Sequence, residues 1–314
     1  MSHVTILGAG AFGRALGQVA ARRGTQVVVW TRRPDVPLPE GLQRAATLQE
    51  AVAPSQLLFF CAPAAHARPL LRALGDVAHG GHFLVHAARG LEPCDEGGLP
   101  VSEIVRQETP IRRIGVLAGP LVPEELAAAI PSAIVVASRF PEVSQAAQEA
   151  LAQEALRVYA SDDLLGVEYS AALMTVLALA AGLATGLGGG VSTRSLVITR
   201  GLAESGRLLE ALGGRVRTLV GLGGIGEVFV TAQGIESPDY HLGVALAQGA
   251  TADSVRTRLG RSSEGPQMAR LAAQLAAAKK VRAPLFHAIA EIVDGKPPRE
   301  TLSALIGGSA PTEI

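Results

Sequence analysis

Three glycines near the start of the chain have the spacing of a phosphate-holding turn. The stretch reads VTILGAGAFGRALGQVAARRG, with Gly8, Gly10 and Gly13 between a short apolar run and a run of good helix formers. In such a strand–turn–helix unit the first glycine makes the turn and the second lets backbone approach a pyrophosphate. The third lets the helix pack closely on the strand. The stretch therefore predicts a dinucleotide site, with Ala11 and Phe12 at the helix N-terminus that faces the phosphates.

Two arginines after the next apolar run bear on which dinucleotide binds. The run Gln26–Trp30 predicts a second strand, and Thr31, Arg32 and Arg33 follow it directly. NAD sites usually place an acidic residue here for the ribose hydroxyls, whereas guanidinium groups suit the 2′-phosphate of NADP. We predict NADP as the preferred cofactor and NAD as the alternative. The other interpretation is that both arginines are solvated loop residues.

The bulk composition narrows the class of protein. Lys plus Arg and Asp plus Glu both number 28 in 314 residues, so no overall field favours nucleic acid or an anionic membrane. Cys61 and Cys94 form neither a CxxC motif nor a Cys/His cluster, and the histidines lack metal-ligand spacing. We predict a cytoplasmic protein that acts on a small molecule, with no metal site and no nucleic-acid partner.

Apolar runs and helical patterns predict two domains that would position these residues. Residues 1–161 are expected to form an α/β Rossmann domain with a doubly wound, mostly parallel sheet, and residues 162–314 an all-helical substrate and dimerisation domain. Further strands are predicted at 57–62, 82–87, 114–118 and 133–137. Helices of the second domain are predicted at 166–187, 193–211, 240–248, 251–259, 265–280 and 285–294.

One apolar stretch raises the question of a membrane span. Residues 169–193 contain no charged side chain. Their many Ala and Gly residues make them only moderately hydrophobic, and three consecutive glycines weaken the end of the segment. We predict a buried central helix whose small side chains let its neighbours approach, and no membrane span.

Several motifs across nearly the whole chain resemble the bacterial NAD(P)-dependent glycerol-3-phosphate dehydrogenase family. They are GAGAFGRALG, ARGLE, AGP, GVEYSAALMT, ITRGLAESGRLLEALG, GLGGIGEVFVT and SEG. The resemblance implies a Rossmann domain, a helical substrate domain and an active site in the cleft between them. It also implies hydride transfer between a nicotinamide and dihydroxyacetone phosphate or glycerol 3-phosphate, and a homodimer.

The resemblance implies a catalytic set that this chain keeps only in part. Reduction of a ketone needs a cation or an acid beside the oxygen that becomes an alkoxide. The family's acid–base lysine matches Met174, and no lysine precedes Lys279. A second family lysine matches Arg89, and the family's aspartate matches Glu227. Thr231 fits the family pattern.

The resemblance also implies positions for substrate and cofactor. Where the family has Ser-Arg-Asn, this chain has Ser237, Pro238 and Asp239, and the Asp239 carboxylate would repel a phosphate. Gly119 fits the family's substrate segment, and Pro63 and Glu264 fit its cofactor site, to which Arg89 is also assigned.

Three hypotheses therefore stay open. The chain is an oxidoreductase that uses glycerol 3-phosphate or an altered small carbonyl substrate, with water, His241 or Tyr240 as candidate proton sources. Alternatively it is a catalytically impaired NADP-binding protein that keeps the cofactor as a signal or a structural element. In the third hypothesis it is a purely structural or regulatory homologue.

Overall fold

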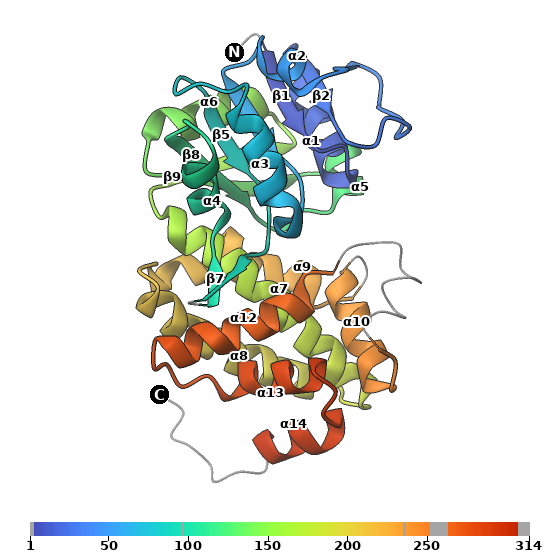
Figure 1. Cartoon of the computed structure of the whole chain (residues 1–314). Helices are drawn as coiled ribbons and strands as arrows, with labels where there is room; N and C mark the ends of the chain where they lie inside the picture. The colour runs from blue at the N-terminus through green and yellow to red at the C-terminus, as the bar shows by residue number, and fades with distance from the viewer. Residues whose placement is uncertain (1–2, 96, 235–236, 252–262, 307–314) are drawn as a thin grey trace.

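The computed structural model describes residues 3–95, 97–234, 237–251 and 263–306 (Figure 1). A sheet covered by helices forms the N-terminal part, and helices alone form the C-terminal part. The predicted fold class is therefore confirmed. The predicted helix at 251–259 lies largely outside the described residues.

Eight strands form one sheet, and six of its seven neighbouring strand pairs are parallel. β8 (Arg113–Ala118) and β9 (Ser132–Ser138) run antiparallel, and every other neighbouring pair is parallel. The spatial order is β10 (Leu156–Ser161), β9 (Ser132–Ser138), β8 (Arg113–Ala118), β5 (Phe83–His86), β4 (Leu57–Phe60), β1 (His3–Leu7), β2 (Gln26–Trp30) and β3 (Leu42–Arg44).

The strand order reverses between β1 and β4, and this decides where a ligand can bind. From β1 the chain moves outward to β2 and β3, and then returns to β4 on the other side of β1. Helices that cross from opposite sides of the sheet leave a crevice at such a point, beyond the carboxyl ends of the strands. The turn after β1 and the segment after β4 meet there: Cys61 N–H donates to the Leu7 carbonyl at 2.8 Å.

Apolar side chains bury both faces of the sheet. One face packs against α1 (Ala11–Arg22), α5 (Pro123–Ala127) and α6 (Pro141–Leu151). The other packs against α2 (Leu48–Val52), α3 (Ala67–Gly75) and α4 (Val101–Glu108). Burial on both faces explains why the central strands are continuous apolar runs that the sequence alone can locate.

The C-terminal part is built around α7 (Leu164–Gly186), the long apolar helix. It has the length and hydropathy of a membrane span, yet 94% of its apolar window is buried inside the protein, which confirms the predicted core helix. The other α-helices described in the C-terminal part are α8 (Val191–Ala211), α9 (Glu227–Thr231), α10 (Pro238–Ala247), α12 (Gly265–Ala278), α13 (Pro284–Val293) and α14 (Pro298–Ile306).

Glycines let α7 and α10 lie in close contact. A Cβ on Gly182 of α7 would lie 2.0 Å from the Tyr240 carbonyl oxygen, and one on Gly243 of α10 would lie 2.1 Å from the Leu179 carbonyl oxygen. Any larger side chain would push the two helices apart. The small-residue composition is thus explained by close packing of helices within the protein.

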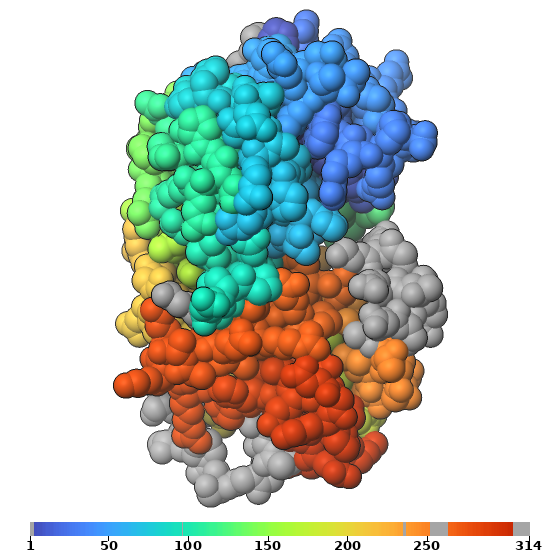
Figure 2. Space-filling view, viewed as in Figure 1, coloured from blue at the N-terminus to red at the C-terminus, as the bar shows by residue number. Residues whose placement is uncertain are grey.

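A two-stranded hairpin reaches from the sheet to the helices. It consists of β6 (Glu92–Cys94) and β7 (Gly97–Leu99), and it lies on α12 (Figures 1 and 2). Before the hairpin, the Gln267 amide of α12 donates to the Leu91 carbonyl at 3.1 Å. A Cβ on Gly97 would lie 2.9 Å from the Leu275 side chain. The two parts are therefore packed against each other.

A buried polar cluster fixes the start of α7 to the sheet. The Glu168 carboxylate accepts from the Ser102 backbone N–H at 2.9 Å and from the Ser102 hydroxyl at 2.6 Å. His86 Nε2, at the end of β5, lies 2.8 Å from Glu168 Oε1. All three side chains are buried, so Glu168 joins α7, α4 and β5 at one point.

Candidate cofactor and active site

The glycine turn after β1 leaves the N-terminus of α1 open. Gly8 has φ +117°, which favours glycine, and a Cβ on Gly13 would lie 2.1 Å from the Gly8 carbonyl oxygen. A Cβ on Gly10 would meet nothing within 4 Å. Gly10 is the N-cap of α1, which has no capping side chain and no acidic residue in its first turn. These free donors and this open space fit a pyrophosphate.

Other residues predicted for the cofactor lie around this turn. Ala11 and Phe12 begin α1, and Pro63 follows β4, beside β1 in the sheet. Arg32 and Arg33 are exposed after β2, and no ion pair holds either guanidinium group within the described residues. The end of β2 lies beside the glycine turn, because the Gly8 N–H donates to the Trp30 carbonyl at 2.9 Å, and two arginines directly after it are compatible with a 2′-phosphate.

Arg89 and Glu227 form an ion pair between the two parts of the protein. Arg89 Nη1 lies 2.6 Å from Glu227 Oε1; the Arg89 side chain is 38% exposed, and that of Glu227 is 2% exposed. Burial raises the pKa of Glu227, and the Arg89 charge opposes this rise. Glu227 Oε2 is buried without a hydrogen-bond partner in the described structure. The site thus contains a partly exposed guanidinium, that of Arg89, which is held by the buried carboxylate of Glu227.

A π-helical turn places Glu227 at this point. The turn Leu222–Gly226 leads directly into α9, which begins at Glu227. A Cβ on Gly224 would lie 2.3 Å from the Leu219 carbonyl oxygen, and one on Gly223 would lie 3.3 Å from Ala118 at the end of β8. The glycines of GLGGIG therefore let the turn close tightly against the sheet. Turns of this kind often occur at functional sites.

Gly119 and Thr231, both predicted for the site, differ in what they contact. The backbone N–H of Gly119 lowers the pKa of the Glu227 carboxyl. Gly119 has φ +147°, so a side chain there would be strained. The Thr231 hydroxyl donates to the Glu227 carbonyl at 2.9 Å, within α9. Gly119 therefore supports Glu227 from the end of β8, while Thr231 bonds to its own helix.

Two further carboxyl groups feel the Arg89 charge: Glu264, at the N-cap of α12, and Asp239, in the first turn of α10. Glu264 Oε1 accepts from the Ala64 backbone N–H at 3.0 Å, and its Oε2 is buried without a partner in the described structure. Burial raises the pKa of Glu264 to about 7. Burial also raises the pKa of Asp239, and the Arg89 charge lowers the pKa of both groups. Arg89 thus stands among three carboxyl groups.

The segment Ser237–Asp239 begins a helix. Ser237 is the N-cap of α10, and its hydroxyl accepts from the Tyr240 N–H at 3.2 Å. Pro238 occupies the first turn, where its missing N–H costs nothing. Asp239 Oδ1 accepts from the Ser263 hydroxyl at 2.5 Å and from the Gly265 N–H at 2.7 Å. These bonds to Asp239 were not foreseen, because the partners follow a long connection from α10.

Met174 lies in the interior of α7. Its side chain is fully buried and belongs to the apolar cluster of the helical part. The three lysines of the chain, Lys279, Lys280 and Lys296, lie at the distant ends of α12 and α13, and each is exposed. No lysine therefore takes the place of an acid–base group near Arg89 in the described part of the chain.

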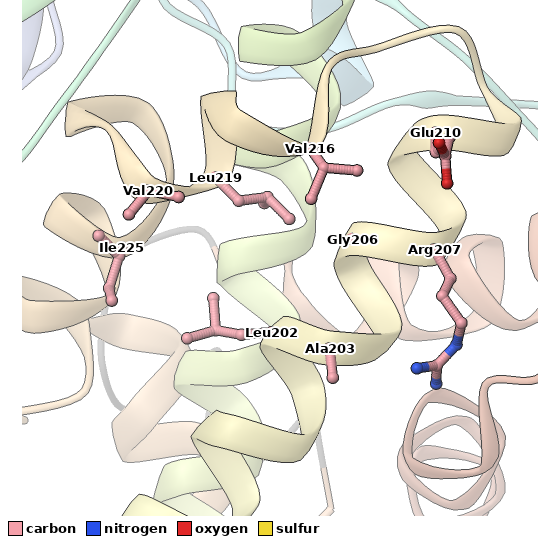
Figure 3. A pocket seen from close by; sticks show the side chains of 9 residues that line it. All are labelled: Leu202, Ala203, Gly206, Arg207, Glu210, Val216, Leu219, Val220 and Ile225. Atoms are coloured by element: carbon pink, nitrogen blue, oxygen red, sulfur yellow. The ribbon is translucent and has the colours of Figure 1, made fainter. Parts of the chain in front are cut away.

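A surface groove on the helical part is lined by none of the predicted site residues, although Ile225 of the turn before Glu227 borders it. It has a volume of about 400 Å³ and runs between α8 and the short helix Val216–Val220 (Figure 3). Leu202, Val216 and Leu219 point into it, whereas the Arg207 guanidinium points away and donates to the Arg282 carbonyl at 3.0 Å. Apart from Arg207 and Glu210, the residues that line it are apolar or glycine.

Comparison with known proteins assigns this arrangement to a family. Models of the NAD-dependent glycerol-3-phosphate dehydrogenase N-terminus and C-terminus match residues 3–144 and 163–303. The chain belongs to this family. A glycerol-3-phosphate dehydrogenase [NAD(P)+] of Ralstonia nicotianae is 36% identical over 338 residues, with 99% of each chain covered. One of Thioalkalivibrio sulfidiphilus is 35% identical, with 92% of each covered.

Solved structures agree with the family assignment. The glycerol-3-phosphate dehydrogenase of Coxiella burnetii superposes with a TM-score of 0.91 at 27% identity, covering 98% of this chain and 99% of the other. A ketopantoate reductase of Ralstonia eutropha superposes with a TM-score of 0.61 at 13% identity, covering 96% and 99%, which shows a shared fold alone. The predicted family and its nicotinamide cofactor class are therefore supported, and the individual site residues stay predictions.

Proposed function

We propose that this family member is an NAD(P)-dependent oxidoreductase that transfers a hydride between the nicotinamide and a small carbonyl or alcohol. The observation that supports this most is the coexistence of an open α1 N-terminus and the Arg89–Glu227 pair along one edge of the sheet. The cofactor supplies the hydride when it is bound. The rest of the chemistry falls to the chain.

Arg89 has the chemistry to stabilise the reacting oxygen. When a ketone accepts a hydride, negative charge develops on its oxygen, and a fixed cation beside that oxygen lowers the barrier. The Arg89 side chain is 38% exposed, so a ligand can reach it, while Glu227 holds it from the buried side. Arginine keeps its proton at neutral pH, and we therefore assign it charge stabilisation without proton transfer. Glu227 is the residue that positions it.

The proposed cofactor residues are Gly8, Gly10, Gly13, Ala11, Phe12, Pro63 and Glu264, with Arg32 and Arg33 selecting NADP. The proposed substrate region adds Gly119, Ser237, Asp239 and Thr231 to Arg89 and Glu227. A boundary between residues 161 and 162, a homodimer and a cytoplasmic location are parts of the same proposal.

A second candidate is a catalytically impaired homologue that binds NADP in a regulatory or structural role. The buried Met174 side chain, at the position of the family's lysine, favours it. In that case cofactor binding persists without turnover.

One experiment separates the two candidates. Calorimetric titration with NADPH and with NADH measures cofactor binding, and a panel of small ketones and aldehydes is then added while nicotinamide absorbance is recorded. Oxidation that is lost in Arg89→Gln but kept in Arg113→Gln, an exposed arginine paired with Glu142, supports the oxidoreductase. Tight binding without oxidation of any carbonyl supports the second candidate, and absence of binding contradicts both.

A further inference from the structure

The N-termini of two helices at the site differ in what fills them. The α1 N-terminus has no side chain on its free N–H groups. The N-terminus of α12, a helix of 14 residues, holds Asp239, whose carboxylate accepts from Gly265 N–H at 2.7 Å and from the Ser263 hydroxyl at 2.5 Å. Backbone N–H groups of this kind, with the helix dipole, are typical donors to a phosphate. At α12, the Gly265 N–H already donates to the Asp239 carboxylate of the chain itself.

The Arg89 guanidinium at the site is also already paired with a carboxylate of the chain. Arg89 pairs with Glu227 at 2.6 Å, and its charge also acts on Asp239 and Glu264. Within the described part of the chain, Arg89 is the positive group that acts on these three carboxyls. A phosphate dianion entering here would add two negative charges to this set, and the one described cation that acts on these carboxyls is already paired.

Buried acceptors at the site call for a ligand that donates hydrogen bonds. Glu227 Oε2 and Glu264 Oε2 are buried, and neither has a hydrogen-bond partner in the described structure. The Glu227 side chain is only 2% exposed, which makes an unmet acceptor costly. A hydroxyl group can donate to an ionised carboxylate and accept from a protonated one, whereas a phosphate dianion only accepts.

We propose that Asp239 fills, from within the chain, the anion position of this site, and that the substrate is an uncharged, hydroxyl-bearing ketone or aldehyde without a phosphate group. This inference rests on the proposed oxidoreductase function and names its substrate class. In the reduction, the carbonyl carbon takes a hydride from the reduced nicotinamide and the oxygen takes a proton from solvent. The products are the alcohol and the oxidised nicotinamide.

Dihydroxyacetone and dihydroxyacetone phosphate form a matched pair for the test, because they differ by the phosphate alone. We expect kcat/KM with NADPH to favour dihydroxyacetone by at least about tenfold, the scale of one unfavourable charge contact. A preference for the phosphate ester, or turnover only of carbonyls that carry no hydroxyl group, overturns the inference and leaves the proposed function intact. Failure to bind any nicotinamide overturns both.

Variants of Asp239 test the mechanism of exclusion. Asp239→Ala empties the α12 N-terminus, and we expect inorganic phosphate to become a competitive inhibitor and the preference to shift at least tenfold toward the phosphate ester, by the same charge argument. Asp239→Asn keeps an acceptor oxygen for both donors and removes the charge, so it should fold and shift the preference less. Asp294→Asn, an exposed aspartate paired with Arg270, serves as the control. An unchanged preference in folded Asp239→Ala and Asp239→Asn contradicts the proposed role of Asp239.

Discussion

The Arg89 guanidinium and the Glu227 carboxylate meet at 2.6 Å, with the cation 38% exposed and the anion 2% exposed. The pair joins the segment after β5 to the start of α9, two elements that belong to different parts of the chain. Because the carboxylate is buried, it holds the guanidinium in one position at the end of the sheet. A cation held in this way can act on a developing charge without first reorganising.

Replacement of Arg89 is therefore expected to affect both activity and stability. Arg89→Gln should lower kcat/KM by about 10²- to 10³-fold, the usual loss for one preorganised donor. It should also lower the free energy of unfolding by about 1–3 kcal/mol, because Glu227 stays buried without its partner while solvent already screens part of the pair. Steady-state kinetics and urea unfolding measure the two effects. Wild-type activity in Arg89→Gln would contradict the assigned role, and Arg113→Gln is the matched control.

The glycine turn offers two substitutions with opposite expected effects. Gly10→Ala adds a methyl group into open space, so the melting temperature should hardly change while nicotinamide affinity falls at least about tenfold. Gly13→Ala would place its Cβ 2.1 Å from the Gly8 carbonyl oxygen and should destabilise the fold. Calorimetry and thermal unfolding of both variants test the assignment. Unchanged cofactor binding in Gly10→Ala would place the pyrophosphate elsewhere.

Arg32 and Arg33 are predicted to set cofactor preference. The double variant Arg32→Ser, Arg33→Ser should lose about 10- to 100-fold of its NADPH affinity, since two contacts to the 2′-phosphate disappear. Its NADH affinity should stay unchanged. Equal losses for NADPH and NADH would show that the arginines act on a part common to both cofactors. Parallel titrations with the two cofactors decide this.

Glu264 gives the expected dependence of stability on pH. Its pKa is raised from 4.5 to about 7 in the folded protein, so the folded state holds a proton that the unfolded state releases as pH rises through this window. Stability from this group is therefore present below pH 4.5 and is lost up to about pH 7, by about 3 kcal/mol at most. Urea unfolding at several pH values should show this decline in the wild type and a smaller one in Glu264→Gln. Identical profiles would contradict the raised pKa.

Met174→Lys tests whether the family's lysine can be restored. The variant places an ammonium in a fully buried, apolar helix, and burial should lower the pKa of the new lysine. The unfolded state then binds more protons, so the variant should be weakest at low pH and recover as pH rises. We expect a loss of about 3–5 kcal/mol at neutral pH, with Met174→Leu as the control. A stable variant with increased activity would show that the position faces the substrate.

Sequence pattern located the elements that packing makes apolar and missed those that are short or exposed. The strands at the centre of the sheet and α7 appear as long apolar runs. β3 has three residues, none of them buried, and the hairpin of β6 and β7 contains two glycines and a proline, so neither has a strand pattern. β10 alternates as an edge strand whose exposed Tyr159 and Arg157 obscured it. α14 was also missed, as its first residues are Pro, Arg and Glu.

The site was predictable where residues are close in sequence and unpredictable where they are distant. The glycine turn is one continuous motif, and its geometry follows from local steric rules. Arg89 and Glu227 were each identified through the family resemblance, but their contact depends on how α9 packs against the sheet. The bonds from Ser263 and Gly265 to Asp239 depend on the distant start of α12. No local pattern encodes such a contact.

The junction of Glu168 with Ser102 and His86 has a mechanical consequence. α7 has 23 residues, so it is a rod of about 35 Å at 1.5 Å per residue, with its first turn fixed to the sheet and its remainder enclosed by the other helices. Separating the two parts would require α7 to lose its contacts with either the sheet or the surrounding helices. Because both parts pack against α7, neither can unfold without disturbing the other, and the chain is expected to unfold in one cooperative step.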